Sequence, residues 1–178
     1  MMKVFVNDRS IEYFTKLKVI YNNFFKKKLK EDNFIKEKLE DLLKAINNSK
    51  RVFIETGSFD FCAKCAKSGE KCCQAGLEWK LRKEEFFINL LLAEKIGHSI
   101  EFNLKRPEDC LFLGEKGCSL IFTPLFCRNF FCDKLSKFLG RERLIKIQQT
   151  MEEEAIFGFE LSDYITRKYL IPYFNLLR

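Results

Sequence analysis

The chain has 178 residues, of which 47% are hydrophobic and 32% charged, as in ordinary globular domains. Its longest apolar run, residues 86–93, includes Asn89 and is much shorter than the roughly 20 residues that span a membrane. Near the N-terminus, Asp8 and Arg9 interrupt the region where a secretory signal has its apolar stretch. These features argue against a membrane span, and they predict a cytoplasmic protein that has no membrane association.

The net charge of +7 is concentrated at the N-terminus, since residues 1–50 hold 12 Lys and Arg against 7 Asp and Glu. The most basic feature is the Lys-Lys-Lys-Leu-Lys run at residues 26–30. Such a run can contact nucleic acid, yet it is also typical of the solvated C-terminal end of a helix. Because the chain has no RNA-binding motif, nucleic acid is a disfavoured partner, whereas an unknown protein partner is left open.

The first third of the chain has apolar residues at steps of three and four. This spacing predicts an N-terminal helical hairpin over residues 1–54. Asp32 or Asn33 can cap its second helix, and the Asn-Asn-Ser sequence at residues 47–49 is expected to close that helix.

The middle of the chain, residues 55–132, is expected to be a cysteine-rich metal-binding segment. The elements predicted in it are, in chain order, a loop at 55–76, a helix from about Arg82 to Lys95 ended by Gly97, an extended piece at 100–104 and a second loop at 107–132. The apolar spacing of residues 133–178 predicts C-terminal helices, with a break at Gly140 and a new helix starting at Ser162 or Asp163.

The expected fold is therefore mainly α. About five to six helices are predicted to form a scaffold around two irregular cysteine-rich loops, which form a metal site. No internal repeat and no low-complexity linker divides the sequence, so a single domain is expected over residues 1–178.

The cysteines are the most informative residues of the chain, because all eight fall within one segment. They are Cys62, Cys65, Cys72, Cys73, Cys110, Cys118, Cys127 and Cys132. Thiols stay reduced in the cytoplasm, so a cluster of them there indicates metal binding or catalysis rather than a disulfide framework. The adjacent pair Cys72-Cys73 also argues against simple pairing, because a disulfide between neighbours is strained.

Four thiolates can bind one zinc ion or one [4Fe–4S] cluster, so eight can form two sites of either kind. Cys62-x2-Cys65 is a chelating half-site. The gaps in Cys110-x7-Cys118-x8-Cys127 are long for zinc half-sites, and a single histidine leaves almost no mixed cysteine–histidine ligands. Adjacent cysteines suit a larger inorganic core or one ligand in each of two neighbouring sites. These features favour iron–sulfur, with zinc as the alternative.

The segment contains several recognisable blocks, which are Cys62-x2-Cys65-x6-Cys72-Cys73, Cys110-Leu111-Phe112-Leu113, Gly117-Cys118-Ser119-Leu120-Ile121-Phe122, Pro124 and Cys127-Arg128-x-Phe130-x-Cys132. Together they resemble the CxxCxxCC family, which is also described as a zinc- or iron-chelating domain. The resemblance covers residues 62–132 and implies metal chelation by these cysteines. The chain departs from the family in having six residues, rather than two, before the paired cysteines, and Thr123-Pro124 in place of Arg-Pro.

Other candidates outside the cysteines are weaker. His98 is the only histidine and follows a predicted helix end, where a surface role is the ordinary one. The Glu pair at 84–85 and the Glu run at 152–154 are expected to be solvated faces, since no Glu-x-x-His partner accompanies them. Trp79 is expected to pack over the metal site. Arg128 is expected either to supply positive charge beside the thiolates or to form a surface ion pair.

The leading hypothesis is a cytoplasmic protein whose eight cysteines hold one or two iron–sulfur clusters of the [4Fe–4S] type, in a redox or accessory role. A structural zinc module is the first alternative, and a metal-dependent enzyme with an open coordination position is the second. No catalytic residue is predicted. Because Cys72 and Cys73 diverge, we expect the two cysteine-bearing loops to lie against each other and to share their ligands.

Overall fold

The structure, a computed structural model, describes residues 6–70, 72–115 and 117–176, so residues 1–5, 71, 116 and 177–178 of the expected domain lie outside it. Its architecture is mainly helical, as predicted. The strands β1 (Leu113–Gly114) and β2 (Gly117–Cys118) form one short antiparallel ladder. Within the described ranges, no helix combines the length and the apolar character needed to cross a membrane.

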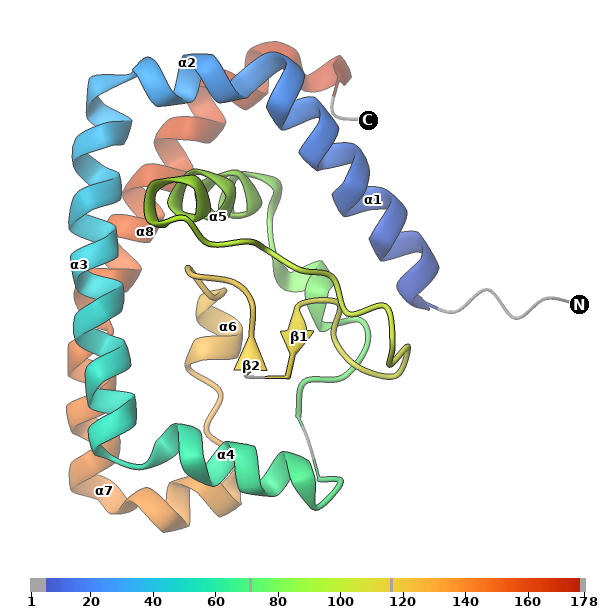
Figure 1. Cartoon of the computed structure of the whole chain (residues 1–178). Helices are drawn as coiled ribbons and strands as arrows, with labels where there is room; N and C mark the ends of the chain where they lie inside the picture. The colour runs from blue at the N-terminus through green and yellow to red at the C-terminus, as the bar shows by residue number, and fades with distance from the viewer. Residues whose placement is uncertain (1–5, 71, 116, 177–178) are drawn as a thin grey trace, which may run out of the picture.

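The N-terminal helices meet at Asp32. Before it come α1 (Val6–Ile20), a π-helical turn (Tyr21–Phe25) and α2 (Lys26–Glu31), and after it comes α3 (Asn33–Glu55). In Figure 1, α1 and α3 separate from this corner and extend in different directions. The two predicted helices are thus present, but they form an open frame rather than a hairpin packed side by side.

Helix α3 continues beyond residues 47–49, where the sequence predicted its end. The reason is tertiary, because Ser49 is completely buried and its hydroxyl group contacts the carboxylate of Glu154, 105 residues further along the chain. The same hydroxyl group also lies 3.0 Å from the carbonyl oxygen of Ile46. A serine that is satisfied in this way does not compete with the helix.

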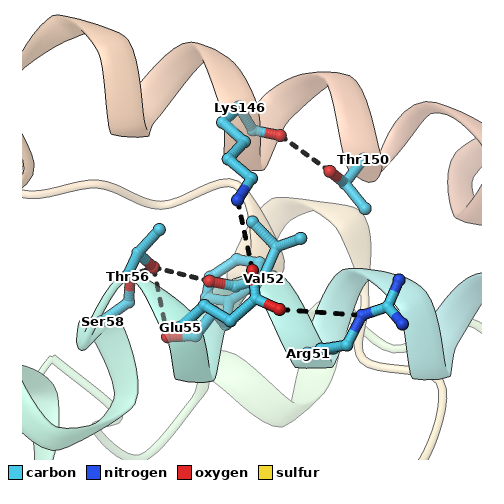
Figure 2. A network of polar contacts seen from close by, with 8 residues as sticks. Arg51, Val52, Glu55, Thr56, Ser58, Lys146 and Thr150 are labelled. Carbon is cyan, nitrogen blue, oxygen red and sulfur yellow. Dashed lines mark hydrogen bonds and ion pairs between the residues drawn. The ribbon is translucent and has the colours of Figure 1, made fainter.

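Polar contacts fix the turn that leads from α3 into α4 (Ser58–Lys67), as Figure 2 shows. The Thr56 hydroxyl group donates to the Val52 carbonyl group at 2.8 Å and lies 2.7 Å from the Ser58 hydroxyl group. Lys146, from a later helix, pairs with Glu55 at 3.2 Å. The prediction of a loop over residues 55–76 is therefore wrong for residues 58–67. Gly57 makes the turn before α4, with φ 73°, and residues 58–67 contain no glycine or proline that would interrupt a helix.

Helix α5 (Lys83–Ile96) follows a 3₁₀ turn (Leu77–Lys80) and is the central helix of the fold. Residues 85–93 are all buried, which explains why apolar residues occur on every side of this part of the helix. Gly97 ends the helix at φ 65°, as predicted. Residues 100–104 were expected to be extended but join no ladder in the described structure.

The C-terminal part contains α6 (Leu125–Arg128), α7 (Asp133–Thr150) and α8 (Glu152–Ile165), followed by a π turn (Thr166–Leu170) and a 3₁₀ turn (Ile171–Leu176). Gly140 breaks α7 as predicted, with φ 67° and ψ 173°. The predicted helix start at Ser162 is wrong, because Ser162 is buried within α8. Helix α8 packs along α3 (Figure 1), and it continues through Ser162 without a break.

The buried apolar residues form two clusters. The larger cluster takes residues from α1, α2, α3, α5 and α8 and from residues 111–122. The smaller cluster consists of Val52, Phe53, Leu135, Leu139, Ile147 and Met151, with Phe61 and Cys132 packed against it. One cysteine-bearing segment therefore rests mainly on the larger cluster, and α4 rests on the smaller one.

Asp32 ties the N-terminal corner to the C-terminal end of the chain. Its carboxylate accepts hydrogen bonds from the backbone N–H of Ile35 at 3.1 Å, from the hydroxyl groups of Tyr164 (3.1 Å) and Tyr169 (2.7 Å), and from the Lys168 ammonium group at 2.7 Å. Burial alone would raise the pKa of Asp32, but these four hydrogen bonds hold it well below the ordinary value.

We predict that Asp32→Ala lowers the free energy of unfolding at neutral pH by about 2 kcal/mol, because a helix cap and three tertiary hydrogen bonds are lost together. A depressed native pKa contributes stability above the unfolded pKa and loses it as pH falls through the native value. The difference from wild type should therefore shrink below about pH 4. Urea denaturation across pH tests this, with the exposed Glu37→Ala as control. A pH-independent difference would contradict the ionic role.

Candidate metal centre

The two cysteine-bearing segments lie against each other, as the sequence predicted. Gln74 and Asp109 form an isolated antiparallel bridge. On either side of this bridge, the Cys110 N–H donates to the Cys73 carbonyl group at 3.1 Å, and the Ala75 N–H donates to the Glu108 carbonyl group at 2.9 Å. Residues 33 to 37 positions apart are thereby held together by their backbones.

All eight cysteines are free thiols. Cys62, Cys72, Cys73 and Cys118 are exposed, and Cys65, Cys110, Cys127 and Cys132 are partly buried. None of them belongs to the fully buried core, although cysteine is among the residue types most often found inside proteins. Their collection at an accessible junction of loops is consistent with ligands rather than with packing residues.

Four of the thiols are electrostatic neighbours, and we call Cys62, Cys65, Cys72 and Cys132 the first thiol group. The first two lie on α4, Cys72 lies in the segment that follows α4, and Cys132 immediately precedes α7. Burial raises the pKa of Cys62 to about 11, and the charges of Cys132, Cys72, Cys65 and Cys73 add to the shift. Burial also raises the pKa of Cys72, and the charges of Cys132, Cys73 and Cys65 raise it further, so Cys73 lies near this group as well. The Cys65 thiol donates to the Glu70 carbonyl group at 3.2 Å.

The remaining four thiols, Cys73, Cys110, Cys118 and Cys127, form the second thiol group, with Cys118 at its centre. Burial raises the pKa of Cys110 to about 12 and that of Cys127 to about 11, and Cys118 and Cys73 add to both shifts. Burial also raises the pKa of Cys73, followed by the charge of Cys118. Each member of this group is thus close to Cys118.

The donor set fits a thiophilic metal, since it consists of eight sulfur atoms and no histidine belongs to either group. Among the residues that the structure describes, however, no three Cys, His, Asp or Glu side chains are gathered closely enough to hold a single ion. The thiols are neighbours without converging on one point. Any metal centre proposed at these cysteines has to be consistent with this arrangement of the thiols.

Asn89 joins the second cysteine-bearing segment to α5. Its completely buried side chain accepts hydrogen bonds from the N–H groups of Ile121 (2.9 Å) and Phe122 (3.0 Å), and it donates to the carbonyl groups of Phe122 (2.8 Å) and Glu85 (2.9 Å). The segment between Cys118 and Cys127 is held in this way. In the sequence, the only signal was a polar residue within an otherwise apolar run.

Arg128, which follows Cys127, is buried rather than part of a surface ion pair. Its guanidinium group donates to the Ser49 hydroxyl group at 3.0 Å, pairs with Glu154 at 3.5 Å and stacks on the Phe53 ring at 4.8 Å. The expectation that the acidic runs are solvated is wrong for two of their members. Glu154 is buried because it neutralises Arg128, and Glu85 is buried because it caps α5 and pairs with Arg82.

Two other expected site residues lie elsewhere. Trp79 does not cover the thiols, because its ring packs against those of Tyr13 (5.2 Å) and Phe14 (6.2 Å) on α1. His98 is exposed, and its ring Nε2 lies 3.0 Å from the Ser119 carbonyl oxygen, so it follows the surface role that was expected.

We predict that Asn89→Leu, which keeps the side-chain size but removes the amide, lowers the free energy of unfolding by about 3 kcal/mol, because three buried backbone groups lose their partner. It should also make Cys118 and Cys127 react faster with a thiol reagent, since their segment is no longer held. Denaturation and mass-spectrometric mapping of the labelled cysteines measure both effects. Asn48→Leu, on the exposed side of α3, is the control. Unchanged labelling would show that Asn89 does not position the segment.

Comparison with protein-family models gave no match for this chain, and neither the curated proteins nor the solved structures contain one. The resemblance to the CxxCxxCC family therefore depends on residues 62–132 themselves, and what it implies about metal is a proposal.

Proposed function

We propose that this is a cytoplasmic metal-binding protein that holds iron–sulfur clusters through its eight cysteines, in a redox or accessory role. The observation that carries the proposal is the arrangement of the thiols. Eight free cysteines come from two distant segments, and they lie at a junction where the backbones of both segments are paired. Four thiolates are the ligand set of a [4Fe–4S] cluster.

The pattern of the cysteines along the chain favours a cluster over a zinc ion. The gaps in Cys110-x7-Cys118-x8-Cys127 are long for zinc half-sites. A cluster also takes four cysteine ligands, and it accepts a wider range of spacings between them.

The side chains of this chain would position the thiolates and control access to them. A bound [4Fe–4S] cluster supplies one-electron chemistry. The exposed Cys62 and Cys72 leave one side of the first thiol group open to the surface, which suits exchange of electrons with another protein. The larger apolar cluster lies next to Cys110 and limits the approach of water from that side.

Zinc is the alternative metal, and it predicts a structural module whose loops are fixed by the ion. The enzyme hypothesis has no observation in its favour. It calls for a pocket at the thiols, and the two clearest surface hollows among the described residues lie on α3, α7 and α8, with no cysteine in their lining. We therefore do not propose a reaction.

We predict that protein purified without oxygen is coloured and contains iron and acid-labile sulfide in roughly equal amounts, with about four or eight of each per chain. Reduction should produce an electron-spin-resonance signal. A variant with all eight cysteines replaced by serine is the control and should contain neither element. A colourless wild-type protein without iron or sulfide, prepared in the same way, would overturn the proposal, and stoichiometric zinc in it would establish the alternative.

A further inference from the structure

The short helix α6, which carries Cys127, has no buried apolar side chain of its own. Apart from Pro124, which precedes the helix and is buried, its attachment to the fold depends on Arg128, the only buried residue of α6. The side chains of Leu125 and Phe126, which could have anchored the helix, are 50% and 55% exposed. A helix of one turn has little stability by itself. The position of α6 therefore depends on a buried arginine, a residue type that is rarely buried unless it is paired.

The guanidinium group of Arg128 joins α6 to two long helices. Its terminal nitrogen donates to the Ser49 hydroxyl group on α3 at 3.0 Å, and the same nitrogen lies 3.5 Å from the Glu154 carboxylate on α8. The Ser49 hydroxyl group contacts that carboxylate as well. All three side chains are buried. A single group thus ties α6 to both helices of the α3–α8 pair.

The same guanidinium group also lies among aromatic rings. It is 4.8 Å from the ring centre of Phe53 on α3 and 5.9 Å from that of Phe59 on α4, and the two rings stack at 5.1 Å. Helix α4 is the helix that carries Cys62 and Cys65. Arg128 therefore lies where a helix from each cysteine-bearing segment meets α3.

The orientation of Arg128 determines that of its neighbour Cys127. Successive side chains of a helix project roughly 100° apart. The N–H groups of both residues lie 2.9 Å from the Pro124 carbonyl oxygen, to which they donate, and these bonds close the single turn of α6. When the guanidinium group is held in one place, the direction of the Cα–Cβ bond of Cys127 is held with it.

Stability alone does not explain a buried arginine at this position. The cost of removing an ion pair from water offsets most of the attraction between its members, and an apolar side chain often serves equally well. A guanidinium group adds direction, because its planar set of donors can bond polar partners while its face lies on a ring. The ammonium group of lysine has the same charge but not this shape. Shape and charge can therefore be separated by experiment.

We propose that Arg128 is a positioning residue: the hydrogen bonds and ring contacts of its guanidinium group fix α6 and thereby keep Cys127 at the junction of the two cysteine-bearing segments. This inference rests on the proposed function, in which Cys127 is a metal ligand. The role does not depend on the charge of Arg128, which is matched by that of Glu154.

Thiol labelling of the reduced, metal-free protein, mapped by mass spectrometry, tests the positioning role. Arg128→Lys keeps the charge, yet Cys127 should react about tenfold faster, as expected for the loss of a hydrogen bond to a charged group. Ser49→Ala removes a partner of the guanidinium group and should accelerate the same thiol. Cys110 is the internal reference and should react at the wild-type rate. Arg51→Lys, on α3 with a side chain that is 69% exposed, is the matched control and should change neither rate.

The iron content of the same variants tests the link to the metal centre. Purified without oxygen, Arg128→Lys should hold less than roughly half of the wild-type iron, because residues that orient ligands affect metal affinity, and Arg51→Lys should hold all of it. Full iron in Arg128→Lys would overturn this link.

The labelling rates have two outcomes that would overturn the positioning role. If Arg128→Lys leaves the labelling of Cys127 unchanged, a positive charge is sufficient there. If Cys127 and Cys110 are accelerated equally, the variant has only lowered the stability of the whole fold. A wild-type protein without iron would refute the proposed function instead, while the labelling rates would still decide whether Arg128 fixes Cys127.

Discussion

The buried amide of Asn89 is the interaction that connects the helical part of this protein to its cysteine-bearing part. It satisfies three backbone groups of the segment that links Cys118 to Cys127, and it does so from the middle of the most buried helix. An irregular segment cannot satisfy its own polar groups in the way that a helix does. The amide therefore adds a polar attachment to the apolar packing of residues 111–122 against the core.

Much of the helical scaffold can be predicted from the sequence, because its signals are local. The cap at Asp32, the end at Gly97 and the break at Gly140 each depend on the chemistry of one residue and its near neighbours. The failures depend on distant partners. Helix α3 passes through Ser49 because Glu154 is packed against that residue, and no local pattern reveals a contact across 105 positions.

The cysteines show the same division between local and distant information. Their residue type and their confinement to one segment indicated metal chemistry, but the helical setting of Cys62 and Cys65 was missed. The residues that join the two cysteine-bearing segments could not be predicted, since the backbone bridge pairs Gln74 with Asp109, thirty-five positions later. The charges of Arg128 and of the partly buried Lys50 act on Cys118, and these two residues come from α6 and α3 and share no motif.

The most direct test of this account is the location of the metal. Crystals of the chain, grown without oxygen from protein that retains its native metal, can be measured at the absorption edge of that metal. The account predicts that the anomalous peaks lie among the sulfur atoms of the eight cysteines, at the junction of the two cysteine-bearing segments. The absence of any peak near a cysteine would contradict it.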